Sequence, residues 1–295
     1  IMKKKFICFI LILFTVLSYF LVLSSADENS SFGKGKETYD LAIITCEQFV
    51  DEFQLLAIHK KTVGIETLIK STNEIYDEYS GVDAAEQIKY FIKDAVENYG
   101  ISFVMLAGDE SIIQVRVSNL NDSVEMSFPS DLYYADLYNE TGDFCSWDSN
   151  GNGIFAEWNF TSKDILDLYP DVSLGRIPCS NQSEVERSIY KIITYEKTGA
   201  GDWFDNVLLC GGDTCISEDA YNEGECINDE IKSILADDSY SFDKLWASNG
   251  NLSVANITAT INEGVGFIDF SGLGNSTSWM THPHNDSESY LPNGG

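Results

Sequence analysis

Oxygen-bearing side chains recur at alternate positions in one short stretch of the chain. The run DSNGNG, 148–153, places them ahead of a glycine that permits a tight turn, and Glu157 follows it. Calcium prefers oxygen ligands spaced in this way. Asn159 stands where an EF-hand has its bidentate Glu, so Glu157 would have to close the site. We expect structural calcium here, against the alternative of a polar turn satisfied by its own side chains. The expected ligands are Asp148, Asn150, Asn152 and Glu157.

Two apolar runs of strand type end in residues that could serve a functional site. Gly108 and Asp109 follow one run, at the place where open α/β sheets bring functional loops. The carboxylate of Asp109 can equally cap the segment after it. The other run, 266–270, leads into the segment SGLGN, 271–275, in which two glycines flank Leu273. Both places need a sheet to position them.

Strands and helices alternate along the chain as they do in βαβ units. The capping pairs Asp83 with Glu86 and Ser183 with Glu186 begin two of the predicted helices. A polar, aromatic region at 131–164 interrupts the alternation, and we place a boundary there between subdomains 38–165 and 166–295. The pattern predicts an α/β fold of mainly parallel sheets flanked by helices. Expected strands are 41–45, 64–70, 102–107, 172–177, 207–210, 242–247 and 266–270, and expected helices are 48–60, 83–99, a segment from 183, 224–235 and 254–261.

The N-terminal residues have the composition of a secretory signal. Three lysines precede an apolar run, 6–23, and small residues follow at Ser24 and Ala26. We expect a signal peptide at 1–26 and a secreted or cell-surface protein; a membrane is a partner only if this segment stays uncleaved. With 47 acidic and 18 basic residues, the net charge is −29, which excludes nucleic acid as an expected partner because phosphate would be repelled.

Six cysteines follow the signal segment, and their spacing matches no zinc site of paired CxxC units. Export permits disulfides, and Cys215 with Cys226 is the pair that we expect first because both lie in one local segment. The alternative is that the six are buried small side chains. His59 lies on a predicted helix and is expected to be an ordinary surface residue. The six are Cys46, Cys145, Cys179, Cys210, Cys215 and Cys226.

Several segments, in one order along the chain, resemble the gingipain family of cysteine peptidases. The segment FIDFSGLGN with the following SW and THP resembles that family's Gly-His-Gly corner. The resemblance also covers PSDLYYAD at 129–136, the loop 148–157, DVSLGRIP at 171–178, and WF at 203–204 ahead of the GGD turn at 211–213. It spans most of residues 39–286. It implies a caspase-like fold, with the catalytic subdomain incomplete in this sequence.

The resemblance also implies a chemistry. In that family a His between the two glycines acts with a Cys on a later strand, because a thiolate attacks the peptide carbonyl and imidazole protonates the leaving amine. The resemblance assigns Asp171 to orient the His and the backbone N–H of Gly274 to hold the oxyanion. Leu273 occupies the His position and cannot transfer a proton. None of the six cysteines matches the nucleophile, and His282 or His284 would need a different geometry to replace the base.

We therefore expect a secreted gingipain-type cysteine endopeptidase acting on protein or peptide, inactive in the sequence as it stands. The alternative, from another class, is a non-catalytic peptidase-like module that binds protein, glycan or calcium at the cell surface. A nucleotide-dependent enzyme is disfavoured, because no GxGxxG or Walker-type loop follows the first predicted strand.

Overall fold

The computed structural model describes residues 37–121, 127–199, 201–213, 222–235, 239–274 and 278–281. The expected signal peptide, the Cys215 side of the expected disulfide, and both His282 and His284 lie outside these residues. Within the described ranges, no helix is long and apolar enough to cross a membrane. The chain divides into two compact units, Ile1–Lys197 and Thr198–Gly295.

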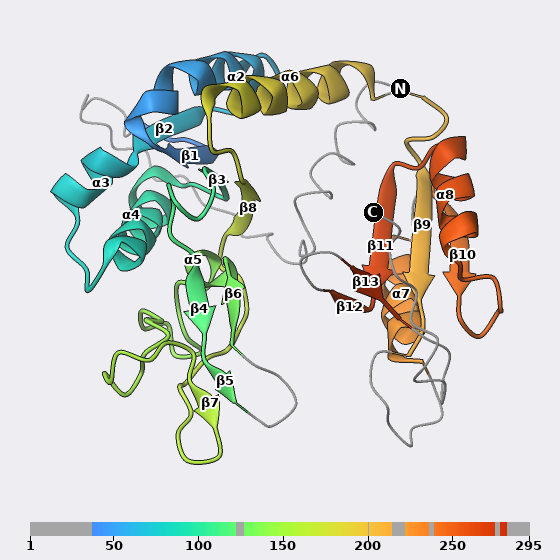
Figure 1. Cartoon of the computed structure of the whole chain (residues 1–295). Helices are drawn as coiled ribbons and strands as arrows, with labels where there is room; N and C mark the ends of the chain where they lie inside the picture. The colour runs from blue at the N-terminus through green and yellow to red at the C-terminus, as the bar shows by residue number, and fades with distance from the viewer. Residues whose placement is uncertain are drawn as a thin grey trace, which may run out of the picture. The chain divides into compact units, whose positions relative to one another are not determined.

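The first unit is built on a four-stranded parallel sheet in the order β2-β1-β3-β8. The central strand β1 is buried on both faces: Ala42 and Ile44 belong to one hydrophobic cluster, and Leu41 and Ile43 belong to the other. Helices α3 and α4 cover the first face, and α2 and α6 cover the second (Figure 1). The strands are β1 Leu41–Thr45, β2 Thr67–Ser71, β3 Phe103–Ala107 and β8 Ser173–Ile177; the helices are the short 3-10 turn η1 Glu47–Phe49, α2 Val50–Thr62, α3 Thr72–Glu78, α4 Ala84–Tyr99 and α6 Gln182–Thr198.

Helix α4 begins and ends at the residues that the sequence indicates. The side chain of Asp83 accepts a hydrogen bond from the Glu86 N–H at 2.9 Å, and Gly100 has the left-handed conformation, φ 76°, that ends the helix. Ile88 and Phe91 on its apolar face lie in the same cluster as Ala42 and Ile44. The capping residues therefore fix the span of the helix, and the apolar face fixes its place on the sheet.

The segment between β3 and β8 forms two small sheets that are anchored to α4 by Arg116. The guanidinium donates from Nη1 and Nη2 to the Asp83 carboxylate at 2.7 and 2.9 Å, and its central carbon lies 3.6 Å from the Phe155 ring centroid. β4 pairs with β6 in antiparallel fashion and β5 pairs with β7 in parallel. The elements are β4 Arg116–Ser118, β5 Leu120–Asn121, β6 Phe128–Ser130, α5 Leu132–Ala135 and β7 Trp158–Asn159.

The second unit contains a three-stranded parallel sheet in the order β10-β9-β11. Leu208 and Cys210 of the central strand pack in one cluster with Ile257 of α8. On the other face, Gly211 lies against α7, since a Cβ there would be 2.6 Å from the Asn228 side chain. The elements are β9 Asn206–Gly211, α7 Glu223–Ile234, β10 Ser241–Trp246, α8 Val254–Glu263, β11 Phe267–Ser271, β12 Leu273–Gly274 and β13 Trp279–Met280.

Three features differ from the sequence-based expectation. The division between units falls after Lys197, later than the expected 165/166, because β8 pairs with β3 and α6 packs on the first sheet. Helix α6 is not capped by Ser183 with Glu186: Glu184 N donates to Asn181 Oδ1, and Glu184 Oε2 accepts from Ser180 N. Helix α3 is an additional element of the first unit.

Candidate functional site

The predicted corner lies at the carboxyl end of β11. The chain leaves Ser271, turns at Gly272 and forms the short antiparallel pair β12–β13, in which Leu273 faces Met280 and Gly274 faces Trp279. A Cβ on Gly272 would lie 2.6 Å from the Met280 carbonyl oxygen, so only glycine fits at this point. The turn therefore depends on a backbone close approach.

Leu273 projects from this turn and is 39% exposed. A Cβ on Gly274 would have nothing within 4 Å among the described residues. The surface at the corner is thus open on the side of both residues. The oxyanion role of the Gly274 N–H and the occupation of the His position by Leu273 stay predictions.

A buried polar network lies directly beneath the corner. Asn228 of α7 is fully buried; its Nδ2 donates to Asp269 Oδ2 at 2.6 Å and to Ser271 Oγ at 3.1 Å. Its Oδ1 accepts from Trp246 Nε1 at 3.0 Å. Ser271 Oγ also donates to Asp269 at 2.6 Å. One helical side chain thereby joins the ends of β10 and β11, and the corner leaves the sheet from a fixed point.

Sequence reasoning missed one acid that the fold brings to the same edge. Asp213 follows β9, the strand next to β11, and is 1% exposed. Its carbonyl oxygen accepts from Thr281 Oγ1 at 2.9 Å, immediately after β13. The carboxyl ends of neighbouring parallel strands meet at one edge of a sheet. The sequence signal for this acid was the GGD turn, 211–213, which follows the predicted strand 207–210.

Asp171 lies in the first unit, just before β8, where it organises a loop. One carboxylate oxygen accepts from Leu137 N at 2.6 Å and from Tyr138 N at 2.9 Å. Leu273 belongs to the second unit. The role of Asp171 in orienting a base therefore stays a prediction, and its described role is local.

The described cysteines form no disulfide with one another. Burial raises the pKa of Cys210, inside β9, to about 12, with the Asp269 charge adding to the shift. Burial likewise raises the pKa values of Cys145 and Cys179 to about 11. A nucleophile must be a thiolate. These three side chains are therefore protonated at neutral pH and fit the interpretation as buried small residues, whereas Cys46 is half-buried and Cys226 is exposed.

The expected calcium loop is a network of hydrogen bonds in one turn. The Asp148 carboxylate accepts from the N–H groups of Asn152 and Gly153 at 3.0 and 2.9 Å. Glu157 Oε2 accepts from Asn152 Nδ2 at 2.9 Å and Asn150 Nδ2 at 3.5 Å. The four expected ligands thus lie together, but the two amides direct nitrogen, not oxygen, to Glu157.

Calcium would fit this loop after both side-chain amides turn over, because the oxygens would then join the carboxylates. No group of three or more His, Cys, Asp or Glu side chains able to hold a metal occurs in the part of the chain that the structure describes. The site therefore depends on its asparagine oxygens. Calcium stays a prediction.

Two other expectations are decided by local contacts. Asp109 Oδ1 accepts from Ser111 N at 2.9 Å and from the Ser111 hydroxyl at 2.6 Å, so this acid caps the turn after β3. The expectation of a surface His59 is wrong. His59 is 8% exposed, and its Nε2 lies 2.8 Å from Glu196 Oε2, because α6 covers this face of α2.

A family model and named relatives connect the chain with one family of peptidases. Residues 34–294 match the family model of peptidase family C25. Gingipain R2 of Porphyromonas gingivalis is 21% identical over 255 residues, which cover 83% of this chain and 29% of that protein. An uncharacterized protein of Archaeoglobus fulgidus is 28% identical over 176 residues, covering 57% of this chain and 38% of that protein.

Solved structures have the same fold. The crystal structure of the Arg-specific cysteine proteinase gingipain R (RgpB) matches with a TM-score of 0.57 and 19% identity, over 88% of this chain and 51% of that one. The complex of the Porphyromonas gingivalis RgpB pro- and mature domains gives the same TM-score and identity, over 81% and 49%. The chain thus spans less than two fifths of these curated relatives and about half of these solved chains.

Proposed function

Because this chain belongs to peptidase family C25, we propose that it is part of a secreted gingipain-type cysteine endopeptidase in which Leu273 has replaced the proton-transferring residue. The observation that carries the proposal is the corner itself. Two glycines and the β12–β13 pair hold Leu273 exposed at the carboxyl end of β11, and the buried acid Asp213 follows the neighbouring strand β9. The substrate class is protein or peptide.

The proposed chemistry assigns each group a separate task. A His at position 273 would take the proton of the thiol, and the thiolate would attack the scissile carbonyl while the N–H of Gly274 stabilises the oxyanion. The imidazolium would then protonate the departing amine, and water would release the acyl group from sulfur. We assign the orienting role to Asp213, which lies in the same unit as that position, whereas the Asp171 carboxylate accepts hydrogen bonds from two loop amides. Leucine has no proton to give. The chain with Leu273 therefore positions a peptide without cleaving it.

The test uses the complete protein and its Leu273→His variant. Cleavage of an unstructured fluorescent protein substrate is expected only in the variant, and alkylation of its thiols should abolish the cleavage. Ile261→His is the matched control, since Ile261 is 41% exposed on α8 and lies away from the corner. Cleavage by the unmodified protein, or cleavage that survives alkylation, would overturn the proposal.

A second candidate function is a non-catalytic module that binds protein, glycan or calcium at the cell surface. The same Leu273 favours it, together with the three buried thiols of raised pKa. If a folded Leu273→His variant cleaves nothing, this second function replaces the first. Secretion and calcium binding belong to both proposals and do not separate them.

A further inference from the structure

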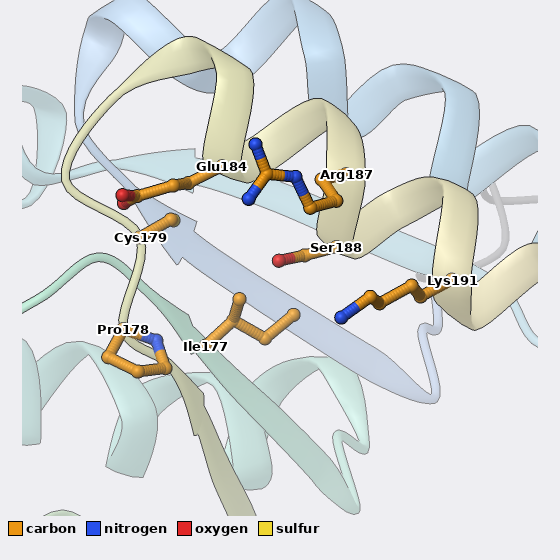
Figure 2. A pocket seen from close by; sticks show the side chains of 7 residues that line it. All are labelled: Ile177, Pro178, Cys179, Glu184, Arg187, Ser188 and Lys191. Atoms are coloured by element: carbon orange, nitrogen blue, oxygen red, sulfur yellow. The ribbon is translucent and has the colours of Figure 1, made fainter.

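A cavity of about 220 Å³ lies in the first unit, between α6 and the segment that leads into it. The segment 177–179 forms one wall, and Glu184, Arg187, Ser188 and Lys191 form the other. Figure 2 shows Ser188 and Lys191 pointing from α6 toward the side of Ile177, and the Arg187 side chain extending toward Glu184. Nothing in the proposed peptidase chemistry uses these side chains.

The two basic residues of this pocket are exceptional in a chain so rich in acid. Elsewhere in the described part, each lysine or arginine except Lys197 has a carboxylate within 4.0 Å or an aromatic ring as partner. Arg187 and Lys191 have neither among the described residues. Acidic residues outnumber basic ones 47 to 18, so a shortage of carboxylates does not explain why these two side chains lack a partner.

The groups that line the cavity define the ligand chemistry. A guanidinium binds a carboxylate or phosphate through two parallel hydrogen bonds, and an ammonium adds a second positive charge. The Ser188 hydroxyl supplies a further donor. Ile177 and Pro178 form an apolar wall, and the volume exceeds what a bare inorganic anion fills. An organic anion with a small apolar group satisfies both walls.

The Glu184 carboxylate restricts which kind of anion the pocket can bind. Its Oε2 accepts from the N–H and hydroxyl of Ser180 at 2.8 and 3.0 Å, and these hydrogen bonds lower the pKa of Glu184, with Arg187 adding to the effect. The carboxylate therefore stays negative at neutral pH and repels a ligand that carries two negative charges. Its other oxygen is an acceptor for an N–H group of the ligand. A monoanion followed by an amide N–H matches this pattern.

We propose that this pocket binds the carboxylate end of a short peptide. The terminal carboxylate lies on Arg187 and Lys191, the last side chain packs on Ile177 and Pro178, and the preceding amide N–H donates to Glu184. The binding does not require the corner at Leu273, so it stands or falls separately from the proposed peptidase activity.

The experiment measures binding of N-acetyl-Gly-Leu to the complete protein by calorimetry. The free acid should bind, its C-terminal amide should bind at least about tenfold more weakly, and inorganic phosphate should not compete at the same concentration. N-acetyl-Glu-amide tests an acidic side chain as the other source of a carboxylate. Binding of this compound as tight as that of the free acid would overturn the assignment to a chain terminus.

Variants that remove positive charge test whether the ligand binds at Arg187 and Lys191. Arg187→Gln with Lys191→Gln should weaken binding of the free acid by about tenfold or more. Lys197→Gln, on the same helix and away from the pocket, should leave it unchanged. The three positions are on the helix surface, and circular dichroism checks the fold. Equal affinity in the double variant and the control, or no binding of the free acid to the unmodified protein, would overturn the proposal.

Discussion

Lys89 shows how burial changes the charge of a single residue. It is fully buried in α4; its Nζ donates to the Cys145 carbonyl oxygen and lies 4.2 Å from the Tyr133 ring centroid. Burial lowers the pKa of Lys89 to about 8; Asp136 opposes this shift and Arg116 adds to it. A carbonyl dipole and aromatic ring faces are thus the main groups that stabilise the charged form of Lys89. The protonation state of Lys89 therefore affects the free energy of unfolding.

Replacement of Lys89 by Met should remove part of the pH dependence of stability. Between pH 8 and the ordinary lysine pKa of about 10.5, the unfolded chain binds more protons than the folded chain, so this group raises stability as pH rises. From pH 7 to pH 10, the unmodified protein should gain about 2 to 3 kcal/mol relative to Lys89→Met. Urea unfolding at the two pH values measures this, with Lys93→Met on the same helix as control. An equal difference at both pH values would contradict the shift.

Replacement of Asp148, one of the four expected ligands, tests whether the loop binds calcium. Calcium that binds only the folded state stabilises it by about 2.7 kcal/mol at a concentration of 100 Kd. The melting temperature of the unmodified protein should therefore rise with calcium and fall with a chelator, whereas Asp148→Ala should not respond. Asp143→Ala, in the preceding loop, is the control and should respond as the unmodified protein does. A response retained in Asp148→Ala would remove the site.

At the scale of elements, the start of α7 depends on a glycine. A Cβ on Gly224 would lie 2.4 Å from the Ser271 carbonyl oxygen and 2.9 Å from that of Gly212. Both atoms are backbone and cannot turn away. The first turn of α7 can therefore lie against the ends of β9 and β11 only because residue 224 has no side chain.

Gly224→Ala should destabilise the second unit by about 1 to 3 kcal/mol through overpacking. Hydrogen exchange should quicken in β9 and β11 and stay unchanged in β1 and β3 of the first unit. Gly274→Ala is the matched control, because a Cβ there meets nothing within 4 Å among the described residues. Equal hydrogen-exchange rates in Gly224→Ala and Gly274→Ala would show that a side chain at 224 does not disturb the packing of α7 on β9 and β11.

The regular elements were predictable because their signals are local. The buried run of β1, the cap of α4 at Asp83 and its end at Gly100 are visible within a few residues of sequence. The strands β4 to β7 have two or three residues each, too few for a period to be recognised. Helix α3 was missed although Ser71 and Glu74 form its capping box.

The candidate site was predictable only in part, for a related reason. The corner at Leu273 is a continuous segment, so its residues could be recognised together. Asp213 joins it only through the pairing of β9 with β11, and the contact of His59 with Glu196 joins helices that are far apart in sequence. Such partners depend on topology, which the order of apolar runs does not determine.

For the whole molecule, the dominant electrostatic quantity is the net charge of −29. Like charges repel more strongly in the compact chain than in the extended one, and salt screens the repulsion over about 8 to 10 Å near physiological ionic strength. The melting temperature should therefore rise as sodium chloride increases from 20 to about 300 mM in the presence of a chelator. A fall over this range would show that the described ion pairs outweigh the repulsion.

The corner at Leu273 also bears on how such a protein changes over evolutionary time. Its shape depends on the close approach at Gly272 and on the β12–β13 pair, whereas the side chain at 273 projects outward. The backbone contacts that shape the corner therefore do not require a particular side chain at 273. If the proposed function holds, activity is what constrains this position, and replacement of one codon removes the proton-transferring residue while the backbone of the corner is kept.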